Sequence, residues 1–383
     1  TNCKLSSNCL NLGVYECKSE ITDILKNKED GEINYKNCYL LDVLKKYDLN
    51  VNNFKILIAS ISEPTFNIHN FEELFVEFCK INNLDINKFI FVDSNFKITE
   101  LTKINWKYIP HFIYEGARTA KEIHDSPGTN MNDLLYSPTI STIDEAKSKL
   151  NRNYSFISLN RSNWKIHRTL LGCFFLENNF NNIKWSFLTK PSDVHKRNDS
   201  NTMEYHAEAT EYIRNIFYNN IDNLEKIYPK ELDTFNIPEK NSFRTSDTFD
   251  KNISLDCYFD IVTESVFERD GIFFTEKIIK PIVNLQPFIV ISSKNYLKYF
   301  KETFGFKTFD CIFDESYDDI DDSFERLENI LKQILEISKK SKEELSIMYE
   351  KAFSICEYNR NLLLEKYSNT NEHMINLIKE IEN

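Results

Sequence analysis

Glycine and proline are scarce in this chain of 383 residues, with 7 and 9 copies, which argues against a loop-rich or low-complexity protein. So few glycines form no GxGxxG fingerprint after a strand, which weighs against a dehydrogenase. No apolar run reaches the roughly 20 residues that a membrane-spanning helix needs, and no signal-peptide pattern opens the sequence. We therefore expect a soluble, cytoplasmic protein without a membrane span.

Cysteine is present in an odd number, nine, and no two copies form a CxxC pair or a Cys/His cluster. This pattern argues against a zinc site and against a regular disulfide framework. Several cysteines, such as Cys173 and Cys257, lie in apolar runs and are typical of small core residues. A reducing compartment fits this usage best, and we expect no metal site.

Positive charge is in deficit, since the formal net charge is −12. This disfavours nucleic acid and anionic membranes as partners, although a local basic groove stays open. What the chain has in quantity is apolar surface: 41% of its residues are hydrophobic and 14% aromatic. A chain of this length and composition favours two domains with substantial cores.

Apolar runs that alternate with helical patterns predict parallel sheets. In the first half, strands are predicted over residues 54–61, 88–92 and 108–114, with a helix over 71–81. We assign residues 1–125 to an N-terminal α/β domain. A Pro-, Gly- and Ser-rich stretch then makes 126–150 an interdomain linker region.

The second half repeats this alternation. Strands are predicted over residues 154–159, 184–188, 258–264, 287–292 and 308–313, and we assign residues 151–340 to a C-terminal α/β domain. Amphipathic helices fill residues 341–383. The fold class that we expect is α/β, with two Rossmann-like doubly wound domains that face a cleft and with C-terminal helices. Residues 218–254 are Asn-rich and polar, and their pattern gives no assignment.

The most informative stretch is 255–293, which has the pattern of one strand–loop–helix–strand unit. Thr275 is a plausible N-cap, with Glu276 and Lys277 in the first helical turn. A helix N-terminus suits a phosphate, the Lys adds positive charge, and the Glu can accept hydrogen bonds from sugar hydroxyls. The same residues also fit an ordinary capped helix that binds nothing.

Two arginines follow the first strand of the second domain. Arg161 and Arg168 come after the strand that ends at residue 159, where its βα turn would face the expected cleft. A guanidinium matches phosphate geometry in a bidentate way, so both are candidates for a phosphate. Most lone arginines are surface residues, and that interpretation stays open.

At this point the sequence resembles a known family. The ordered set Val262-Thr263-Glu264-Ser265, Phe274-Thr275-Glu276-Lys277 and Gln286-Pro287-Phe288-Ile289-Val290 is similar to the donor-binding signature of α-1,3-fucosyltransferases and related GT-B glycosyltransferases. Ser158-Leu159-Asn160 followed by Arg168 is similar to that family's strand, Asn and Arg before a helix. The resemblance covers about 135 residues, and its motifs are dense over about 40 of them.

The resemblance implies a role for each matching residue. Glu276 would bind the ribose hydroxyls, Lys277 and Arg168 would neutralise the diphosphate, and Glu264 and Ser265 would line the sugar side. Fixed cations of this kind stabilise a nucleoside diphosphate as it leaves, and they can take the place of a divalent metal. The resemblance therefore implies a GDP- or UDP-linked sugar as co-substrate and no resident cofactor. It also implies that residues 151–340 are the nucleotide-sugar-binding domain and that residues 1–125 lie on the acceptor side.

An inverting transfer needs a base near the acceptor hydroxyl. Glu63 and Glu115 both follow predicted strands of the first half, and we hold them about level as candidates. Asp93 follows another strand and ranks behind them, while His111 falls inside a predicted strand and fits a core histidine better. Each acid is also a common residue where a strand stops.

Together these patterns predict a metal-independent, inverting glycosyltransferase that moves a sugar from a nucleotide donor to an acceptor hydroxyl, on a glycan or another molecule. One alternative is a viral or phage-type transferase that glycosylates hydroxymethylated DNA bases, which would need a basic groove on the first domain. The other is a nucleotide- or glycan-binding protein with no turnover.

Overall fold

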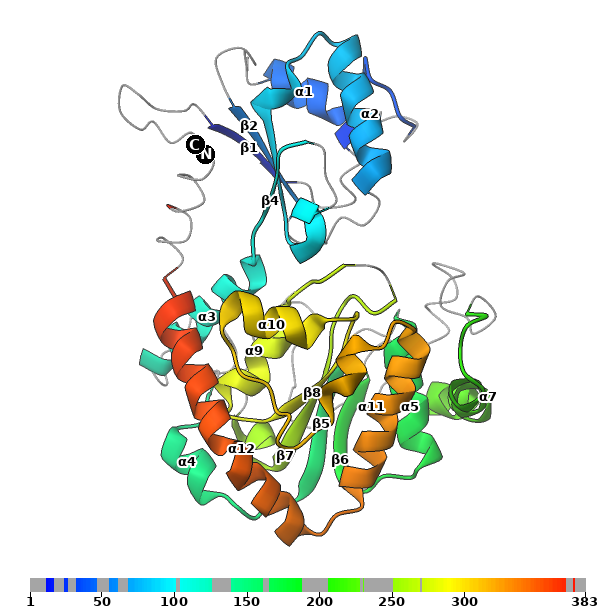
Figure 1. Cartoon of the computed structure of the whole chain (residues 1–383), viewed down its shortest axis with the longest axis vertical. Helices are drawn as coiled ribbons and strands as arrows, with labels where there is room; N and C mark the ends of the chain where they lie inside the picture. Colours follow the sequence, from blue (N-terminus) through cyan, green and yellow to red (C-terminus); the bar gives the residue numbers. More distant parts are fainter. Residues whose placement is uncertain are drawn as a thin grey trace. The chain divides into compact units, whose positions relative to one another are not determined.

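The computed structural model describes most of the chain. The described residues are 12–16, 24–26, 32–46, 55–60, 68–100, 104–125, 139–160, 165–187, 206–227, 230, 251–268, 271–369 and 375. They form a mixed α/β structure with two parallel sheets (Figure 1). No helix in these ranges has the length and apolarity that crossing a bilayer requires.

Two compact units make up the chain. Unit 1 contains Thr1–His111, Arg269–Phe274 and Thr370–Asn383, whereas unit 2 contains Phe112–Glu268 and Thr275–Asn369. Unit 2 therefore holds the Thr275-Glu276-Lys277 motif, although the short segment that leads into this motif belongs to unit 1.

The sheet of unit 1 has four parallel strands that follow one another in chain order. They are β1 (Leu12–Glu16), β2 (Lys55–Ser60), β3 (Phe89–Asp93) and β4 (Trp106–Tyr108). Helices α1 (Tyr39–Lys46) and α2 (Ile68–Ile81) and two short 3₁₀ helices, η2 (Ile86–Lys88) and η3 (Phe96–Glu100), accompany them. The reversal of strand order that defines a doubly wound sheet is not seen among the described strands of this unit.

Aromatic rings build the core of unit 1. Phe71, Phe75 and Phe78 recur on one face of α2 at helical spacing and are fully buried. They pack against the sheet, where the ring centroids of Phe75 and Phe91 lie 4.8 Å apart at near-perpendicular planes. Edge-to-face contacts of this kind add to the free energy gained by burying the rings.

The sheet of unit 2 reverses its order. It consists of β5 (Tyr154–Asn160), β6 (Ile183–Phe187), β7 (Cys257–Thr263) and β8 (Phe288–Ile291), in the spatial order β6-β5-β7-β8 and all parallel. The chain first adds β6 on one side of β5 and then returns to add β7 and β8 on the other. Such a switch point is where open α/β sheets bind ligands, beyond the carboxyl ends of the strands.

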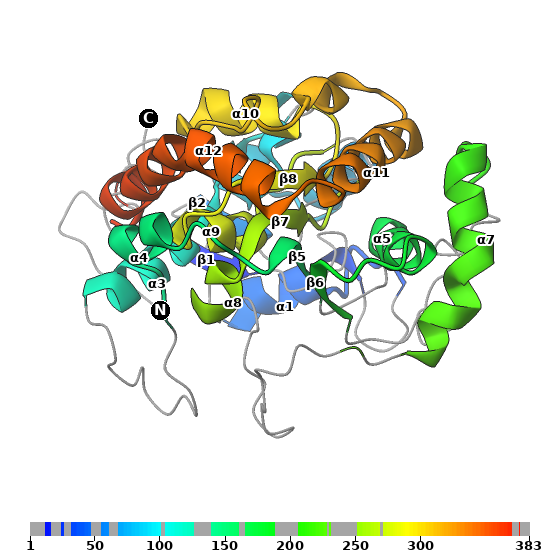
Figure 2. The ribbon, with the colours of Figure 1, turned by 90° about the horizontal axis from the view of Figure 1, so that it is seen from below.

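Helices cover this second sheet. They are α3 (His111–Asp125), α4 (Ile143–Ser148), α5 (Ile166–Glu177), α7 (Glu211–Lys226), α8 (Lys251–Leu255), α9 (Glu276–Val283), α10 (Tyr296–Phe304), η7 (Glu315–Asp319), α11 (Ser323–Ser338), α12 (Lys342–Leu362) and the π-helical turn η8 (Leu363–Tyr367). Helix α12 runs alongside α9 and α4, and α5 packs against α7 and α11 (Figure 2). This packing fixes α5 and α9, the two helices that begin at the switch point.

The predicted strand over residues 108–114 is wrong. Strand β4 ends at Tyr108, and α3 begins at His111. The apolar residues of this run have helical spacing once the helix is followed further, since Ile113, Ala117, Ala120 and Ile123 are buried on one face of α3. Pro110 inside the run is the signal against a strand, because proline cannot donate to a sheet ladder.

A second predicted strand, over residues 308–313, is also wrong. Its apolar side chains Phe309 and Phe313 are buried, as a strand would require. The backbone nevertheless turns, because the N–H groups of Ile312 and Phe313 both donate to the carbonyl of Phe309, at 2.8 and 2.9 Å. Burial in this run therefore comes from a compact turn rather than from a sheet.

Candidate donor-binding site at the switch point of unit 2

The ends of β5 and β7 are joined by a hydrogen bond between side chains. Thr263 Oγ1, at the end of β7, donates to Asn160 Oδ1, at the end of β5, at 2.5 Å. Asn160 Nδ2 in turn donates to Ser158 Oγ at 3.0 Å. Asn160 and Thr263 are both buried. These bonds fix the two strand ends on either side of the switch point.

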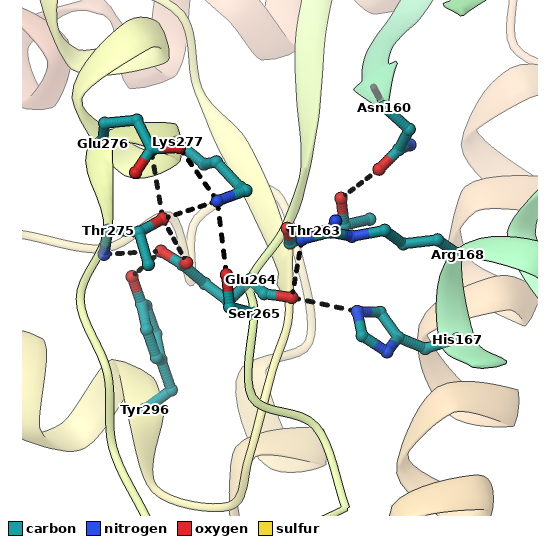
Figure 3. Close-up of polar contacts among 10 residues, drawn as sticks. All are labelled: Asn160, His167, Arg168, Thr263, Glu264, Ser265, Thr275, Glu276, Lys277 and Tyr296. Atoms are coloured by element: carbon teal, nitrogen blue, oxygen red, sulfur yellow. Dashed lines mark hydrogen bonds and ion pairs between the residues drawn. The ribbon is translucent and has the colours of Figure 1, made fainter. Parts of the chain in front are cut away.

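The peptide that follows β7 is held from the side of α5. The backbone carbonyl of Glu264 accepts hydrogen bonds from His167 Nε2 at 2.9 Å and from Arg168 Nη2 at 3.3 Å. Arg168 Nη2 also donates to the Thr263 carbonyl at 3.2 Å. The first turn of α5 thereby places the Arg168 guanidinium against the Thr263–Glu264 main chain (Figure 3).

His167 is neutral in this position. Its ring has 1% of its surface exposed, and burial, with the neighbouring Arg168 charge, lowers its pKa well below the ordinary value. A carbonyl oxygen can only accept, so Nε2 carries the proton that is donated to Glu264. The positive charge on this side of the site therefore belongs to Arg168.

On the other side of the peptide, Thr275 caps α9. Its hydroxyl oxygen accepts the backbone N–H of Lys277 at 3.3 Å, which satisfies one of the amides at the start of the helix. The predicted N-cap is thus confirmed. The first turn of α9 presents Glu276 and Lys277 beyond the end of β7.

The Lys277 ammonium has three oxygen partners. Its Nζ donates to Glu276 Oε1 at 3.0 Å, to Thr275 Oγ1 at 3.1 Å and to Ser265 Oγ at 3.4 Å. Although burial favours the neutral acid, the Lys277 charge and hydrogen bond lower the pKa of Glu276. The side chains of Lys277 and Glu276 keep 26% and 20% of their surface exposed, so solvent and solutes reach this ion pair.

The Glu264 carboxylate lies beneath this pair. It accepts hydrogen bonds from the Thr275 hydroxyl at 2.6 Å, from Tyr296 Oη at 2.7 Å and from the Thr275 backbone N–H at 3.3 Å. Burial raises the pKa of Glu264, and the Lys277 charge and the hydroxyl donors oppose this rise. The residue has no exposed surface.

Two cations thus lie on opposite sides of one short peptide. Figure 3 shows Lys277 on one side of the Glu264–Ser265 main chain and Arg168 on the other. The N-terminal end of α9 adds partial positive charge next to the ammonium. Fixed cations at the carboxyl end of a parallel sheet, with a carboxylate beside them, can bind an anionic ligand that also carries hydroxyl groups.

Not every predicted residue falls in this group. Glu115 lies in α3 instead of a loop after a strand, and its carboxylate pairs with Arg118 through Nη2–Oε1 and Nε–Oε2 contacts of 2.5 and 3.4 Å. Its side chain keeps 42% of its surface exposed. Asp93 has no exposed surface and accepts the Asn95 backbone N–H at 2.6 Å, a contact typical of a turn.

The remaining predictions concern Arg161, Glu63, His111 and the absence of a metal site. Arg161 and Glu63 lie outside the described residues. His111 is the first residue of α3, so its predicted position inside a strand is wrong. Within the described ranges, no three or more His, Cys, Asp or Glu side chains are grouped so that they could hold a metal ion.

The sequence pattern missed three contacts of this group: the hydrogen bond between Thr263 and Asn160, the one from His167 to the Glu264 carbonyl, and the one from Tyr296 to the Glu264 carboxylate. Position at the end of a strand could have identified the first pair, because carboxyl ends of neighbouring parallel strands meet. Nothing in the pattern around Tyr296, 32 residues after Glu264, points to a shared hydrogen bond.

No protein-family profile matches this sequence, and no curated protein matches it. Solved structures similar to this chain include an alpha,alpha-trehalose 6-phosphate synthase from Burkholderia multivorans, with a TM-score of 0.38 and 8% identity over 89% of this chain and 70% of that one. Another is the N-terminal domain of Candida albicans trehalose-6-phosphate phosphatase, with a TM-score of 0.29 and 10% identity over 82% of this chain and 58% of that one. Both TM-scores are below 0.5, so neither similarity indicates a function for this chain.

Proposed function

We propose that this protein is a GT-B-like glycosyltransferase that moves a sugar from a GDP- or UDP-linked donor to an acceptor hydroxyl, with inversion. The observation that carries the proposal is the placement of two cations at the switch point of the unit 2 sheet: Lys277, paired with Glu276, donates to the Ser265 hydroxyl, and Arg168 donates to the Glu264 carbonyl. The α-1,3-fucosyltransferase-like order of motifs over residues 259–292 supports the same assignment.

Each group has a defined part in this proposal. Lys277 and Arg168 bind the diphosphate, Glu276 accepts hydrogen bonds from the ribose hydroxyls, and Ser265 lies on the sugar side. As the glycosidic bond breaks, the nucleoside diphosphate gains negative charge. Cations already fixed at this position stabilise that charge more in the transition state than in the ground state.

The same cations replace a divalent metal in this proposal. An ammonium, a guanidinium and the amides at the start of α9 supply the positive potential that a bound Mg²⁺ would otherwise give. Donor binding and turnover are therefore expected to continue in the presence of a chelator. The general base, which removes the proton from the acceptor hydroxyl, is Glu115 or Glu63.

Binding of nucleoside diphosphates tests the donor site directly. Wild-type protein is titrated with GDP, UDP and their common sugar conjugates, with Mg²⁺ and with EDTA, and unfolding is followed by thermal shift. A ligand at about a hundred times its Kd stabilises by about 2.7 kcal/mol, which raises the melting temperature by several degrees. We expect either the guanosine or the uridine compounds to raise the melting temperature, and we expect the same rise with Mg²⁺ and with EDTA.

Lys277→Ala then identifies the phosphate contact, with Lys294→Ala as the matched control. Lys294 is also in unit 2, and its ammonium pairs with the exposed Asp321 carboxylate, which is not part of the group described above. Loss of a charge-assisted hydrogen bond predicts about ten-fold to hundred-fold weaker binding for Lys277→Ala and no change for Lys294→Ala. Equal affinity in a folded Lys277→Ala variant would remove the phosphate role, and no shift with any diphosphate would overturn the proposal.

A further inference from the structure

One ionisable group in the site cannot touch a ligand in this structure. The Glu264 side chain has no exposed surface, and its two carboxylate oxygens already accept three hydrogen bonds. These bonds come from the starts of two helices, since Thr275 precedes α9 and Tyr296 begins α10, whereas Glu264 directly follows β7. Glu264 therefore connects the end of β7 to the starts of two helices.

The direction of the hydrogen bonds gives this connection a function. The backbone N–H and the Nζ of Lys277 both donate to Thr275 Oγ1, at 3.3 and 3.1 Å. Since the hydroxyl has one proton, that proton is directed to Glu264 Oε2, at 2.6 Å. Three donors are directed at its two oxygens, so Glu264 accepts here as a carboxylate and orients the Thr275 hydroxyl. The oriented hydroxyl in turn fixes the Lys277 ammonium.

We propose that Glu264 is a positioning residue, supported by Tyr296, that holds the Lys277 ammonium in place for the diphosphate through Thr275. This inference rests on the proposed function, and it replaces the expectation that Glu264 contacts the donor sugar. Tyr296 has 1% of its surface exposed, so it acts on a ligand through the carboxylate that it supports rather than by direct contact.

Charge and position make opposite predictions for Glu264→Gln. Glu264 and Lys277 interact electrostatically, so the substitution leaves the site more positive. If charge alone mattered, an anionic diphosphate would bind more tightly. If position matters, the amide offers one acceptor oxygen where the carboxylate offers two, so the set of three hydrogen bonds cannot be kept and binding weakens. The sign of the change separates these two roles.

The experiment uses whichever of GDP or UDP binds the wild-type protein, measured by isothermal titration calorimetry. We expect Glu264→Gln and Thr275→Val to weaken binding by about ten-fold, which corresponds to one hydrogen bond to a charged group. Thr275→Ser keeps the hydroxyl and is expected to bind as the wild type does. Tyr296→Phe is a milder change that leaves all formal charges in place, and we expect a several-fold loss.

Amide hydrogen exchange in the unliganded protein gives a readout that does not depend on the ligand. We expect Glu264→Gln to speed exchange at the Thr275 and Lys277 amides by about ten-fold, with the β8 amides of Phe288–Ile291 unchanged. A wild-type protein that binds neither diphosphate ends the proposed function, and the exchange data then decide the positioning role alone. Unchanged exchange at these two amides, or tighter diphosphate binding by Glu264→Gln, would overturn the inference.

Discussion

Asp260 lies in the middle of β7 with 8% of its surface exposed, and it makes the stability of unit 2 depend on pH. The charged group that acts on its carboxyl is Lys280 of α9. Burial raises the pKa of Asp260 from 3.8 to about 7, and the Lys280 charge offsets only part of this rise. The native protein therefore holds this proton at pH values where an unfolded chain has released it.

The sign of the effect follows from proton counting. Between pH 3.8 and about 7 the native state binds more protons at Asp260 than the unfolded state does, so the free energy of unfolding falls as pH rises. Each pH unit inside this window costs about 1.4 kcal/mol. From pH 5 to pH 7, Asp260 alone lowers the stability of the wild type by roughly 2–3 kcal/mol.

Asp260→Asn removes this titration and keeps the volume of the side chain. Scanning calorimetry of the wild type and the variant, from pH 5 to pH 8, gives the difference in melting temperature for the transition that contains unit 2. We expect the wild type to lose about 5–10 °C relative to the variant as pH rises from 5 to 7. Lys280→Met is expected to extend the window to higher pH, because the charge that favours the ionised form is gone.

Only the pH dependence of this difference tests the reasoning, since a constant offset reports the packing of Asn. A difference that stays flat from pH 5 to pH 8 would show that Asp260 is ionised in the native protein. The burial argument would then be wrong, and a partner for the carboxylate would have to exist.

Substitutions at three other positions test separate parts of the molecule. Arg152→Met is expected to destabilise unit 2 by about 3–5 kcal/mol in chemical denaturation, because the fully buried guanidinium donates to the carbonyls of Ala146, Lys149, Ser254 and Cys257. Arg152→Lys should not restore this stability, since an ammonium cannot span that set; full stability in either variant would contradict the argument. Glu115→Gln and Glu63→Gln should keep donor binding, and the true base should lose about 10²–10⁴-fold in turnover. Full turnover in both variants would place the base elsewhere.

Local sequence patterns predicted the strands and the cap of the candidate site. The runs over 154–159 and 287–292 correspond to β5 and β8, and Thr275 caps α9 as expected. These features depend on apolar runs and on a hydroxyl before a helical pattern, and both are local properties of the chain. Lys277 and Glu276 follow from the cap, because the first turn of a capped helix is fixed by where it begins.

Partners that come from distant parts of the chain could not be predicted in this way. His167 donates to the carbonyl of a residue 97 positions later, and Thr263 donates to an amide 103 positions earlier. Strand β1 was missed for a related reason: LGVYE is short and contains glycine, and its pairing with β2 is what defines it as a strand. Local β-propensity does not determine the order in which strands pair in a sheet.

Strand order is also what turns a capped helix into a candidate site. Thr275, Glu276 and Lys277 alone would describe any capped helix with two charges in its first turn. Because the order is β6-β5-β7-β8, the helix that follows β5 and the helix that follows β7 begin beside the same peptide. Arg168 and Lys277 then approach that peptide from opposite sides. Had β7 been added beyond β6, the two cations would be separated by a strand, and the same motif residues would not form one site.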